Sequence, residues 1–313
     1  MNSPFEEDVF FGLTKTPKSL PSKYIYDHNG DQLFEAIMDL EEYYPTRCET
    51  EIIQNHSQEI FKLIGSEKFD LIEFGPGDGR KTEILLNSLS QNFSSITYIP
   101  IDISVSAIEN IHLNFQKAFP GLKVKGIANE YIAALDEFEK ESERTKVILF
   151  LGTSIGNFSE SELDKFLLNV SGELKTGDFF LVGIDLKKNP FTILSAYNDS
   201  KGITRDFNFN LLTRINREMD ANFNIANFQH YPFYNIQNGN AESFLVSTKT
   251  QKVFISKLNL TINFEAWEPI HTETSRKYSL SDLNNIADKF GFKVIKNFLD
   301  SKGYFVDTLW KRK

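Results

Sequence analysis

The fold of this chain is decided by residues 70–82, which read Asp70-Leu71-Ile72-Glu73-Phe74-Gly75-Pro76-Gly77-Asp78-Gly79-Arg80-Lys81-Thr82. The first five residues form a short, mostly apolar run that is typical of a buried strand, and an amphipathic stretch begins at Lys81. Between them glycine recurs at every second position, and glycine permits positive φ angles and close approach of the backbone to a ligand. Doubly wound α/β sheets bind nucleotides at such a turn. The stretch therefore predicts a parallel sheet with a nucleotide-like ligand at this turn.

The same alternation of strand and helix continues beyond the turn. Short apolar runs at 71–74, 97–103, 123–127, 147–151 and 178–184 alternate with amphipathic stretches at 81–89, 105–119 and 160–174. This pattern is typical of parallel strands joined by crossover helices. Near the C-terminus a helix over 280–290 precedes strands at 293–299 and 304–310, and the short connection between these strands predicts an antiparallel hairpin. We expect a doubly wound, seven-stranded sheet with an antiparallel edge strand.

A second lobe is predicted where this rhythm stops, near Pro190. Residues 191–228 have a helical pattern, and alternating segments follow at 243–247, 252–255 and 258–264. Helical periodicity also precedes the sheet, at 31–38 and 50–64, and Pro45 between them is expected to end the first helix or to shape a loop. A length of 313 residues allows about two domains.

The composition excludes several classes of protein. A net charge of −9 disfavours nucleic acid, whose phosphates require clustered Lys and Arg. Cys48 is the only cysteine, which excludes an intrachain disulfide and a cysteine-based metal site and favours a reducing cytoplasm. The acidic N-terminus lacks the basic region of a signal peptide, and no apolar run approaches the roughly 20 residues of a membrane span. We expect a cytoplasmic protein with no nucleic-acid or membrane partner.

A second acidic strand end points to a ligand at the same edge of the sheet. The next strand ends at Asp102, 25 residues beyond Gly77, where a carboxylate can accept both ribose hydroxyls of a nucleotide. Glu130 and Tyr131 follow the third strand, where an adenine would lie. Other interpretations stay open: the glycines only link strand and helix, Asp102 caps the helix that follows Ser104, or Glu130 and Tyr131 belong to a surface loop.

The Gly-x-Gly-x-Gly spacing, with the acidic Glu73 ahead of it, resembles motif I of class I methyltransferases rather than the G-x-G-x-x-G of dinucleotide enzymes. In that motif the backbone contacts the adenosine and amino acid parts of the cofactor. The resemblance implies S-adenosylmethionine (SAM) as cofactor and S-adenosylhomocysteine (SAH) as product. The five histidines show no metal-ligand spacing, and we expect no metal.

Further segments resemble the signatures of one family, in order along the chain. They include Glu42-Tyr43-Tyr44-Pro45-Thr46-Arg47 and Phe150-Leu151-Gly152-Thr153-Ser154-Ile155-Gly156-Asn157, with others at 17–21, 24–27, 196–199, 202–204, 215–218 and 272–275. From about Pro17 to its C-terminus the chain is similar to the histidine Nα-methyltransferases of ergothioneine biosynthesis. The resemblance implies a methyltransferase domain of residues 60–189 and 277–313, and a substrate-binding domain of residues 1–59 and 190–276.

The resemblance also implies roles for individual residues. It places two catalytic residues, Tyr26 and Asn157, at the α-amino group of the substrate. Around the rest of the substrate it places Tyr197 and Thr204 at the carboxylate, and Tyr43, Glu273 and Ser275 at the side chain. The residues that it places along the cofactor pocket are Glu73, Gly75, Gly77, Lys81, Asp102, Glu130, Tyr131 and Gly152. Of these, Lys81 would lie near the methionine carboxylate.

One residue departs from the family pattern. Where the histidine enzymes have a methionine beside the imidazole, this chain has Ser243, after Glu242. A small polar residue removes an apolar wall, so the pocket is expected to accept another amino acid or to be rebuilt by a nearby aromatic ring. In the side-chain pocket, the carboxylate of Glu273 can accept an imidazole N–H, which favours histidine over apolar substrates.

The predicted function is methylation of the α-amino group of a free amino acid, L-histidine, to Nα-trimethylhistidine, by a monomer. The sulfonium methyl group is already activated, so the enzyme only has to present a neutral amine to it. Such proximity can lower the activation barrier by roughly 7–11 kcal/mol. A phenol of ordinary pKa about 10 is a poor base, so Tyr26 is expected to position the amine. The alternatives are methylation of another amino acid or small amine, a dinucleotide-dependent oxidoreductase on the same sheet, and a catalytically silent binding module.

Overall fold

The computed structural model describes residues 3–66, 68–89, 93–139 and 143–313. The chain divides into two compact units. The sheet unit consists of Pro45–Lys187 and Lys277–Lys313, and the insertion unit consists of Met1–Tyr44 and Lys188–Arg276. Each unit is described by itself below.

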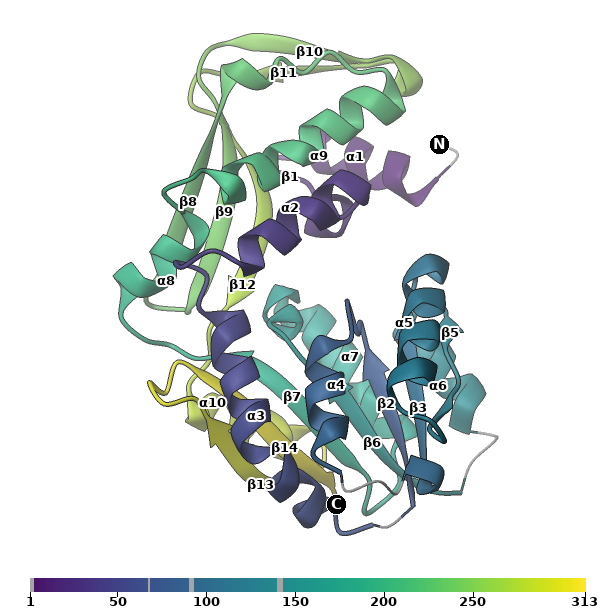
Figure 1. The fold of residues 1–313 in the computed structure, drawn as a ribbon. Helices are drawn as coiled ribbons and strands as arrows, with labels where there is room; N and C mark the ends of the chain where they lie inside the picture. Colours follow the sequence, from purple (N-terminus) through teal and green to yellow (C-terminus); the bar gives the residue numbers. More distant parts are fainter. Residues whose placement is uncertain (1–2, 67, 90–92, 140–142) are drawn as a thin grey trace. The chain divides into compact units, whose positions relative to one another are not determined.

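The sheet unit is built on one continuous, mostly parallel sheet (Figure 1). The strands β4 (Lys123–Val124) and β5 (Ile127–Ala128) both pair with β3 (Ile96–Asp102), so together they fill one edge position. Only β14 (Phe305–Arg312) runs antiparallel to its neighbours among the described strands of this sheet. This confirms the predicted doubly wound sheet of seven positions and its C-terminal hairpin. From the opposite edge to β4, the order is β13 (Phe292–Leu299), β14 (Phe305–Arg312), β7 (Phe179–Asp185), β6 (Thr145–Phe150), β2 (Phe69–Phe74) and β3 (Ile96–Asp102).

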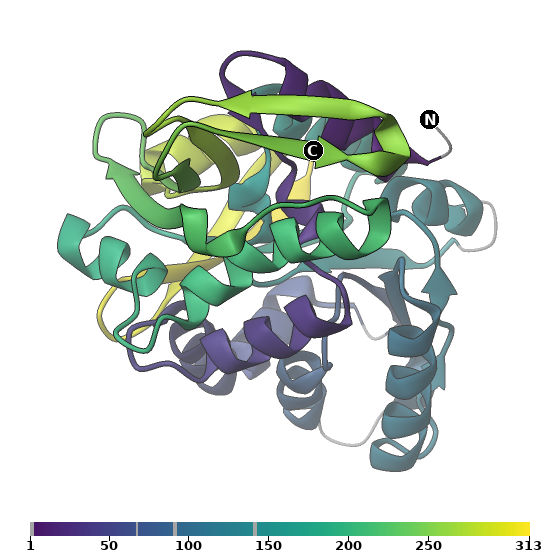
Figure 2. The ribbon, with the colours of Figure 1, turned by 90° about the horizontal axis from the view of Figure 1, so that it is seen from above.

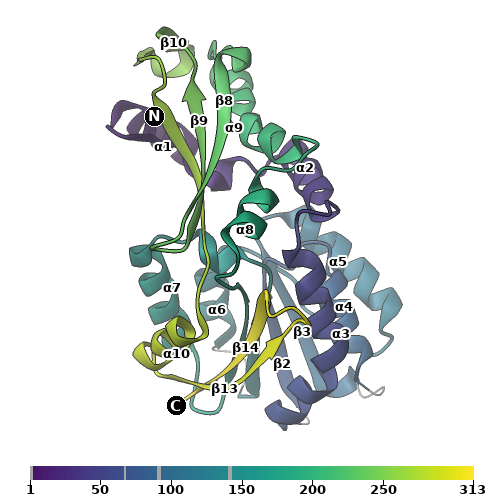
Figure 3. The same ribbon diagram turned by 90° about the vertical axis from the view of Figure 1, so that its left-hand side faces the viewer.

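Helices cover both faces of this sheet (Figure 3). One face carries α3 (Pro45–Ile64), α4 (Arg80–Asn87) and α5 (Val105–Ala118), and the other carries α6 (Tyr131–Glu139), α7 (Glu160–Glu173) and α10 (Leu280–Lys289). The helix α7 shows why these segments form helices. Its buried residues Leu163, Phe166, Leu167 and Val170 recur at the spacing of one helical face, and a capping box at Ser159 satisfies its first N–H groups.

Two expectations for the N-terminal region differ from the structure. Pro45 begins α3 rather than ending the preceding helix, because a proline at the first helical position loses no intrahelical hydrogen bond. The preceding helix, α2 (His28–Met38), has already ended. Since α3 is one continuous helix that packs on α4 and β14, residues 45–59 fall in the sheet unit and not in the substrate-binding part to which the sequence assigned them.

The insertion unit packs helices on a small antiparallel sheet. Its helices α2 and α9 (Ile203–Met219) lie side by side (Figure 2). The predicted helical stretch after Pro190 is present as α8 (Pro190–Tyr197) and α9, whereas α1 (Pro4–Thr14) was not predicted. The strands are β1 (Lys18–Ser19), β12 (Pro269–Arg276), β9 (Asn240–Ser247) and β8 (Phe228–Asn235) in one sheet, and β10 (Gln251–Ile255) with β11 (Leu260–Phe264) in another.

Short 3-10 helices complete the part of the two units that the structure describes. They span Ser22–Tyr24, Phe93–Ser95, Ser154–Asn157, Ile225–Asn227 and Ser256–Leu258. Within the described ranges, none of the helices is both long enough and apolar enough to cross a membrane.

A buried ion pair stabilises the sheet unit where its last segment begins. Lys277 Nζ lies 2.8 Å from Asp185 Oδ2 at the end of β7, and the two side chains are 0% and 2% exposed. Charges buried to this extent are tolerated only as a pair, because each one alone would lack the solvation that it has in water.

We expect Lys277→Met to lower the free energy of unfolding by about 3–5 kcal/mol, because the substitution keeps volume but leaves Asp185 buried without its cation. Urea denaturation measures the loss. The matched control is Lys289→Met, which removes a 2.7 Å pair with Asp164 whose side chains are 57% and 51% exposed. The control should change stability by less than about 1 kcal/mol. Equal losses of stability in the two variants would contradict the conclusion that the buried Lys277–Asp185 pair matters more than an exposed pair.

Candidate functional site

The glycine turn leaves β2 where the order of the strands reverses. The chain passes from β2 to β3 on one side, and β6 lies on the other side of β2. Doubly wound sheets bind ligands at such a switch point. Gly75, Gly77 and Gly79 have φ angles of 63°, 59° and 76°, in the region that favours glycine. The N–H of Gly75 donates to the carbonyl of Ile101 at 2.9 Å, which fixes the turn against β3.

Glu73, one residue before the end of β2, lies in the interior of the sheet unit. The hydroxyl of Tyr98 on β3 donates to its Oε2 at 2.5 Å. Burial raises the pKa of Glu73, although the hydrogen bond from Tyr98 works in the opposite direction. The side chain therefore braces the strand that carries the glycine turn, and its contact with a cofactor stays a prediction.

Asp102 and Tyr131 meet beside the same turn. Asp102 ends β3 and accepts the N–H of Ser104 at 2.9 Å, but the residue that caps α5 is Ser104, whose hydroxyl accepts from Ala107. Tyr131 stacks on Phe74 with ring centroids 4.9 Å apart. Burial, and then the charge of Asp102, raises the pKa of Tyr131 to about 12. The ring also borders the turn, because a Cβ atom on Gly75 would lie 2.8 Å from the Tyr131 hydroxyl.

Lys81 and Gly152 are connected by an acid that the sequence analysis did not identify. Lys81 Nζ donates to Glu49 Oε2 at 2.6 Å, and the N–H of Gly152, after β6, donates to Glu49 Oε1 at 2.5 Å. Glu49 lies on α3 among Cys48, Ile52 and other residues of its buried face. A charged residue on an otherwise apolar helical face was the signal available in the sequence.

In the insertion unit, a cluster of hydroxyl groups surrounds one acid. Glu273 on β12 lies opposite Ser243 on β9, and the Ser243 hydroxyl donates to Glu273 Oε2 at 3.5 Å. Although 37% of Tyr26 is exposed, burial of its hydroxyl raises its pKa well above 10, with further contributions from Glu273, Tyr43 and Tyr197. At neutral pH the Tyr26 phenol is therefore protonated. It can orient an amine by hydrogen bonding but cannot act as an ionised base.

A β-bulge determines which side of the sheet the Glu273 side chain points to. The register between β12 and β9 shifts between His271 and Glu273, which inserts Thr272 as an extra residue. Thr272 Oγ1 lies 2.6 Å from Asn208 Oδ1 on α9, and Asn208 Nδ2 donates to the carbonyl of Thr204 at 3.1 Å. Because of the bulge, Thr272 and Glu273 both point to the inner side of the sheet, and the predicted carboxylate-binding Thr204 is tied to the same strand.

The start of α9 is fixed around Thr204 in a second way. The carboxylate of Asp199 accepts the N–H groups of Ile203 at 2.9 Å and of Thr204 at 2.8 Å. These bonds satisfy backbone donors that a helix leaves without intrahelical partners in its first turn. These bonds fix the loop between Tyr197 and Thr204, the two residues predicted to bind the substrate carboxylate.

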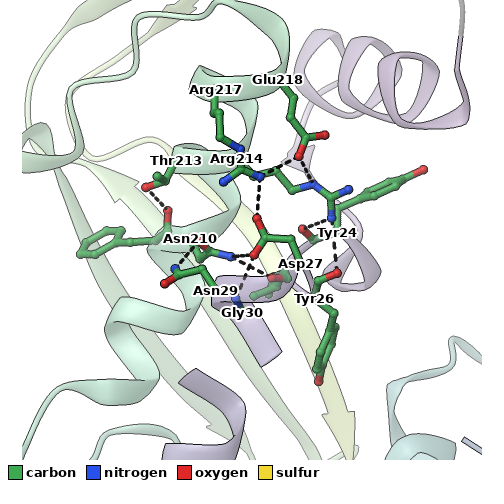
Figure 4. A network of polar contacts seen from close by, with 12 residues as sticks. Tyr24, Tyr26, Asp27, Asn29, Gly30, Asn210, Thr213, Arg214, Arg217 and Glu218 are labelled. Carbon is green, nitrogen blue, oxygen red and sulfur yellow. Dashed lines mark hydrogen bonds and ion pairs between the residues drawn. The ribbon is translucent and has the colours of Figure 1, made fainter. Parts of the chain in front are cut away.

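A polar network on α9 holds the segment that carries Tyr26 (Figure 4). Arg217 Nη2 donates to Asp27 Oδ2, and Asn210 Nδ2 donates to Asp27 Oδ1, both at 2.7 Å. Arg214 Nη1 donates to the carbonyl of Tyr26 at 3.4 Å. Burial opposes ionisation of Asp27, but the bonds from Arg217, from the Gly30 N–H and from Asn210 prevail and lower its pKa to about 2. In Figure 4 the Tyr26 ring points away from this network, so its backbone is anchored while its ring stays available.

Two aromatic rings that the sequence did not single out complete the setting of Tyr26. The ring of Tyr26 packs edge-on against Phe34, at 5.6 Å between centroids, and against Phe207, at 5.3 Å. Phe34 in turn packs against Tyr43 at 6.2 Å. The rings come from α2 and α9, which are adjacent only in the folded unit.

The predicted site residues thus gather in three groups. Gly75, Asp102 and Tyr131 meet at the turn, Lys81 and Gly152 meet through Glu49, and Tyr26, Tyr43, Tyr197, Ser243 and Glu273 meet in the insertion unit. Of the other predicted residues, Glu130 is exposed after β5, Asn157 lies at the end of the 3-10 helix after β6, and Ser275 is buried on β12. Among the described residues, no group of three or more His, Cys, Asp or Glu side chains is placed to hold a metal ion.

Several known proteins are similar to this chain over most of its length. A family described as histidine-specific, SAM-dependent methyltransferases matches residues 5–312. The histidine N-alpha-methyltransferase of Mycobacterium tuberculosis (strain CDC 1551 / Oshkosh) is 34% identical over 298 residues, which cover 95% of this chain and 92% of that protein. Ergothioneine biosynthesis protein 1 of Neurospora crassa is 29% identical over 301 residues, which cover 94% of this chain and 33% of the fungal protein.

A solved structure shows the same fold. The mitomycin 7-O-methyltransferase MmcR matches with a TM-score of 0.50 at 11% identity, over 99% of this chain and 69% of that protein. At this identity the match describes the fold alone.

The glycine turn yields a test with a matched control. Gly77 and Gly303 have φ angles of 59° and 65°, and a Cβ atom added at either would meet no atom within 4 Å. Alanine should therefore cost about 1–2 kcal/mol of backbone strain at both positions. Only Gly77→Ala should also weaken SAH binding, by tenfold or more in calorimetry, because only Gly77 is predicted to contact the cofactor. Unchanged SAH affinity in Gly77→Ala would place the cofactor elsewhere.

Proposed function

The chain belongs to the family of histidine-specific, SAM-dependent methyltransferases, and on that basis we propose that it methylates the α-amino group of free L-histidine. The products would be Nα-trimethylhistidine and SAH, and the reaction would serve ergothioneine biosynthesis. The observation that carries the substrate assignment is the Glu273 carboxylate, which lies beside the small Ser243 within a cluster of tyrosines. A carboxylate in such a place can accept the N–H of an imidazole ring.

The chemistry of the sheet unit fits SAM. Asp102 offers a carboxylate for ribose hydroxyls, and Tyr131, which stacks on the buried Phe74, offers an aromatic ring near it for the adenine. Lys81 offers an ammonium group for the methionine carboxylate, and its side chain is 27% exposed, so it is accessible to a ligand. Bound there, SAM supplies a methyl group that its sulfonium already activates.

The residues of the chain have to present a neutral amine in a fixed direction. The protonated Tyr26 phenol offers oxygen lone pairs to an amine N–H, and Asn157 offers an amide oxygen for a second one. Two such bonds would direct the nitrogen lone pair at the methyl group. Orientation of this kind can lower an activation barrier by roughly 7–11 kcal/mol. Each methylation makes the nitrogen cationic, so a proton leaves to water before each further transfer. The high pKa of Tyr26 makes it a positioning group in this scheme rather than the base.

Ser243 supports a second candidate, the methylation of a larger amino acid at the same site. Ser243 is completely buried, and its hydroxyl faces Glu273 where the related histidine enzymes have methionine. We favour histidine because the acid beside Ser243 retains the acceptor for an imidazole. A cytoplasmic location and the absence of nucleic-acid and membrane partners are predicted from composition and from the lack of a long apolar run, and together with a monomeric state they form part of this proposal.

The substrate is tested with a panel of free amino acids. Incubation of the protein with SAM and each amino acid, followed by mass spectrometry, should give histidine with one, two and three added methyl groups. Other amino acids should react more slowly. Faster reaction of tryptophan or another amino acid would refute the histidine assignment, and the absence of any methylated product would favour a catalytically silent binding module.

Glu273 is tested by a pair of amide substitutions on neighbouring strands. We expect Glu273→Gln to lower kcat/KM for histidine roughly 10- to 100-fold, since a hydrogen bond to a charged group is worth about 1.5–3 kcal/mol. The control is Glu242→Gln, because Glu242 lies next to Ser243 on β9 but on the opposite side of the sheet, near His271. Steady-state kinetics should leave the control within about twofold of wild type. Equal effects of the two substitutions would remove Glu273 from the side-chain pocket.

A further inference from the structure

Glu49 joins two segments of the sheet unit that are far apart in the sequence. It is 1% exposed, and its two carboxylate oxygens accept from Lys81 on α4 and from the backbone of Gly152 after β6. Room for this acid is made by Gly183 on β7. A Cβ atom at Gly183 would lie 2.1 Å from Glu49 Oε1, so any larger residue there would displace the carboxylate.

A second buried acid lies next to Glu49. Asp307 on β14 pairs with Gly183 in the sheet register and is completely buried. No N–H or O–H group of the described residues donates to either of its carboxyl oxygens, while the Glu49 carboxylate is close enough to interact with it. When two buried carboxyl groups lie this close and one of them accepts no hydrogen bond, the like charges favour a state in which one of the two carries a proton.

The charges around this pair decide which acid is protonated. Glu49 faces the Lys81 ammonium and the Gly152 N–H, both of which stabilise an anion. Asp307 has no such donors, and burial, followed by the negative charge of Glu49, raises its pKa well above the usual range, with Lys81 opposing. The remaining charged neighbour is Glu73 on β2, which acts on both Lys81 and Glu49. Glu49 is thus the ion-pair partner of Lys81, and burial favours the neutral form of Asp307.

We propose that Glu49 is a positioning residue of the cofactor site, which holds the Lys81 ammonium and the backbone at Gly152 in place for the carboxylate end of SAM, while the protonated Asp307 carboxyl group donates a hydrogen bond to Glu49. The inference rests on the proposed function, which assigns Lys81 to the methionine carboxylate. An ammonium has three N–H donors, so one bond to Glu49 fixes Lys81 and leaves two for the ligand. A neutral Asp307 prevents a second buried anion from repelling that ligand.

The test compares two ligands that differ at the methionine end. SAH has the carboxylate, whereas 5′-methylthioadenosine has the same adenosine and thioether but neither the carboxylate nor the amino group. We expect Glu49→Gln to raise the Kd of SAH roughly tenfold or more, as expected for loss of a charged hydrogen bond. The Kd of 5′-methylthioadenosine should stay within about twofold. Glu59→Gln, an exposed position on the same helix, is the control and should change neither Kd.

A double-mutant cycle separates positioning from a merely structural role. If Glu49 acts through Lys81, then Glu49→Gln in a Lys81→Met background should weaken SAH no further. Additive losses, equal losses of both ligands in Glu49→Gln, or tighter SAH binding by Glu49→Gln would each overturn the inference. Failure of wild type to bind either ligand would instead overturn the proposed function.

Asp307→Asn tests the protonated acid and remains informative if Glu49→Gln does not fold. The asparagine amide donates an N–H to Glu49 just as a protonated acid donates its O–H, so both Kd values should stay within about twofold of wild type at neutral pH. A selective loss of SAH binding in Asp307→Asn would show that a negative charge is required at this position, and would overturn the proposed arrangement.

Discussion

The reversal of strand order at β2 is the constraint on which the sheet unit depends. Because β3 lies on one side of β2 and β6 on the other, the segments that follow these strands diverge at the carboxyl edge of the sheet. The chain leaves β2 through glycines with positive φ, which lets Gly75 bond to Ile101 while Tyr131 comes close to the same turn. A Cβ atom on Gly75 would collide with the Tyr131 hydroxyl, so the close approach and the glycine depend on each other.

Several acidic side chains lie near the same edge of the sheet. Hydrogen bonds and protonation reduce the electrostatic repulsion between them. Glu49, Glu73 and Asp307 all act on the single ammonium group of Lys81. Three buried carboxylates beside one cation would repel an anionic ligand and destabilise the unit. Tyr98 donates to Glu73, Gly152 donates to Glu49, and burial favours the neutral form of Asp307. Lys81 can then attract the carboxylate of a cofactor although most of its neighbours are acids.

The sequence predicted those parts of the fold that follow regular patterns. Strand and helix alternation and the glycine turn gave the sheet and its C-terminal hairpin, because their periodicity is local. The strand β12 escaped prediction because Thr272 interrupts its alternation at the bulge, and this interruption is what brings Glu273 to the inner side. Glu49 and Asp307 escaped because their partners are distant in the sequence, at Lys81, Gly152 and Gly183. The family resemblance supplied the insertion-unit residues, which no periodicity could have selected.

The substrate pocket proposed for the insertion unit would use two different kinds of discrimination. An apolar wall separates substrates that differ by a methylene or so by only about 10- to 200-fold, whereas a hydrogen-bonding group can reject a substrate that lacks the matching donor by about 10⁴-fold or more. In the proposed pocket Ser243, where the family resemblance implies a methionine, would give up the weaker kind and widen the range of side-chain sizes that fit. In the proposed pocket Glu273 would keep the stronger kind, because an imidazole N–H can donate to its carboxylate and an apolar side chain cannot. The size of the side chain is thus less restricted in this chain than its hydrogen-bonding chemistry, and imidazole satisfies that chemistry.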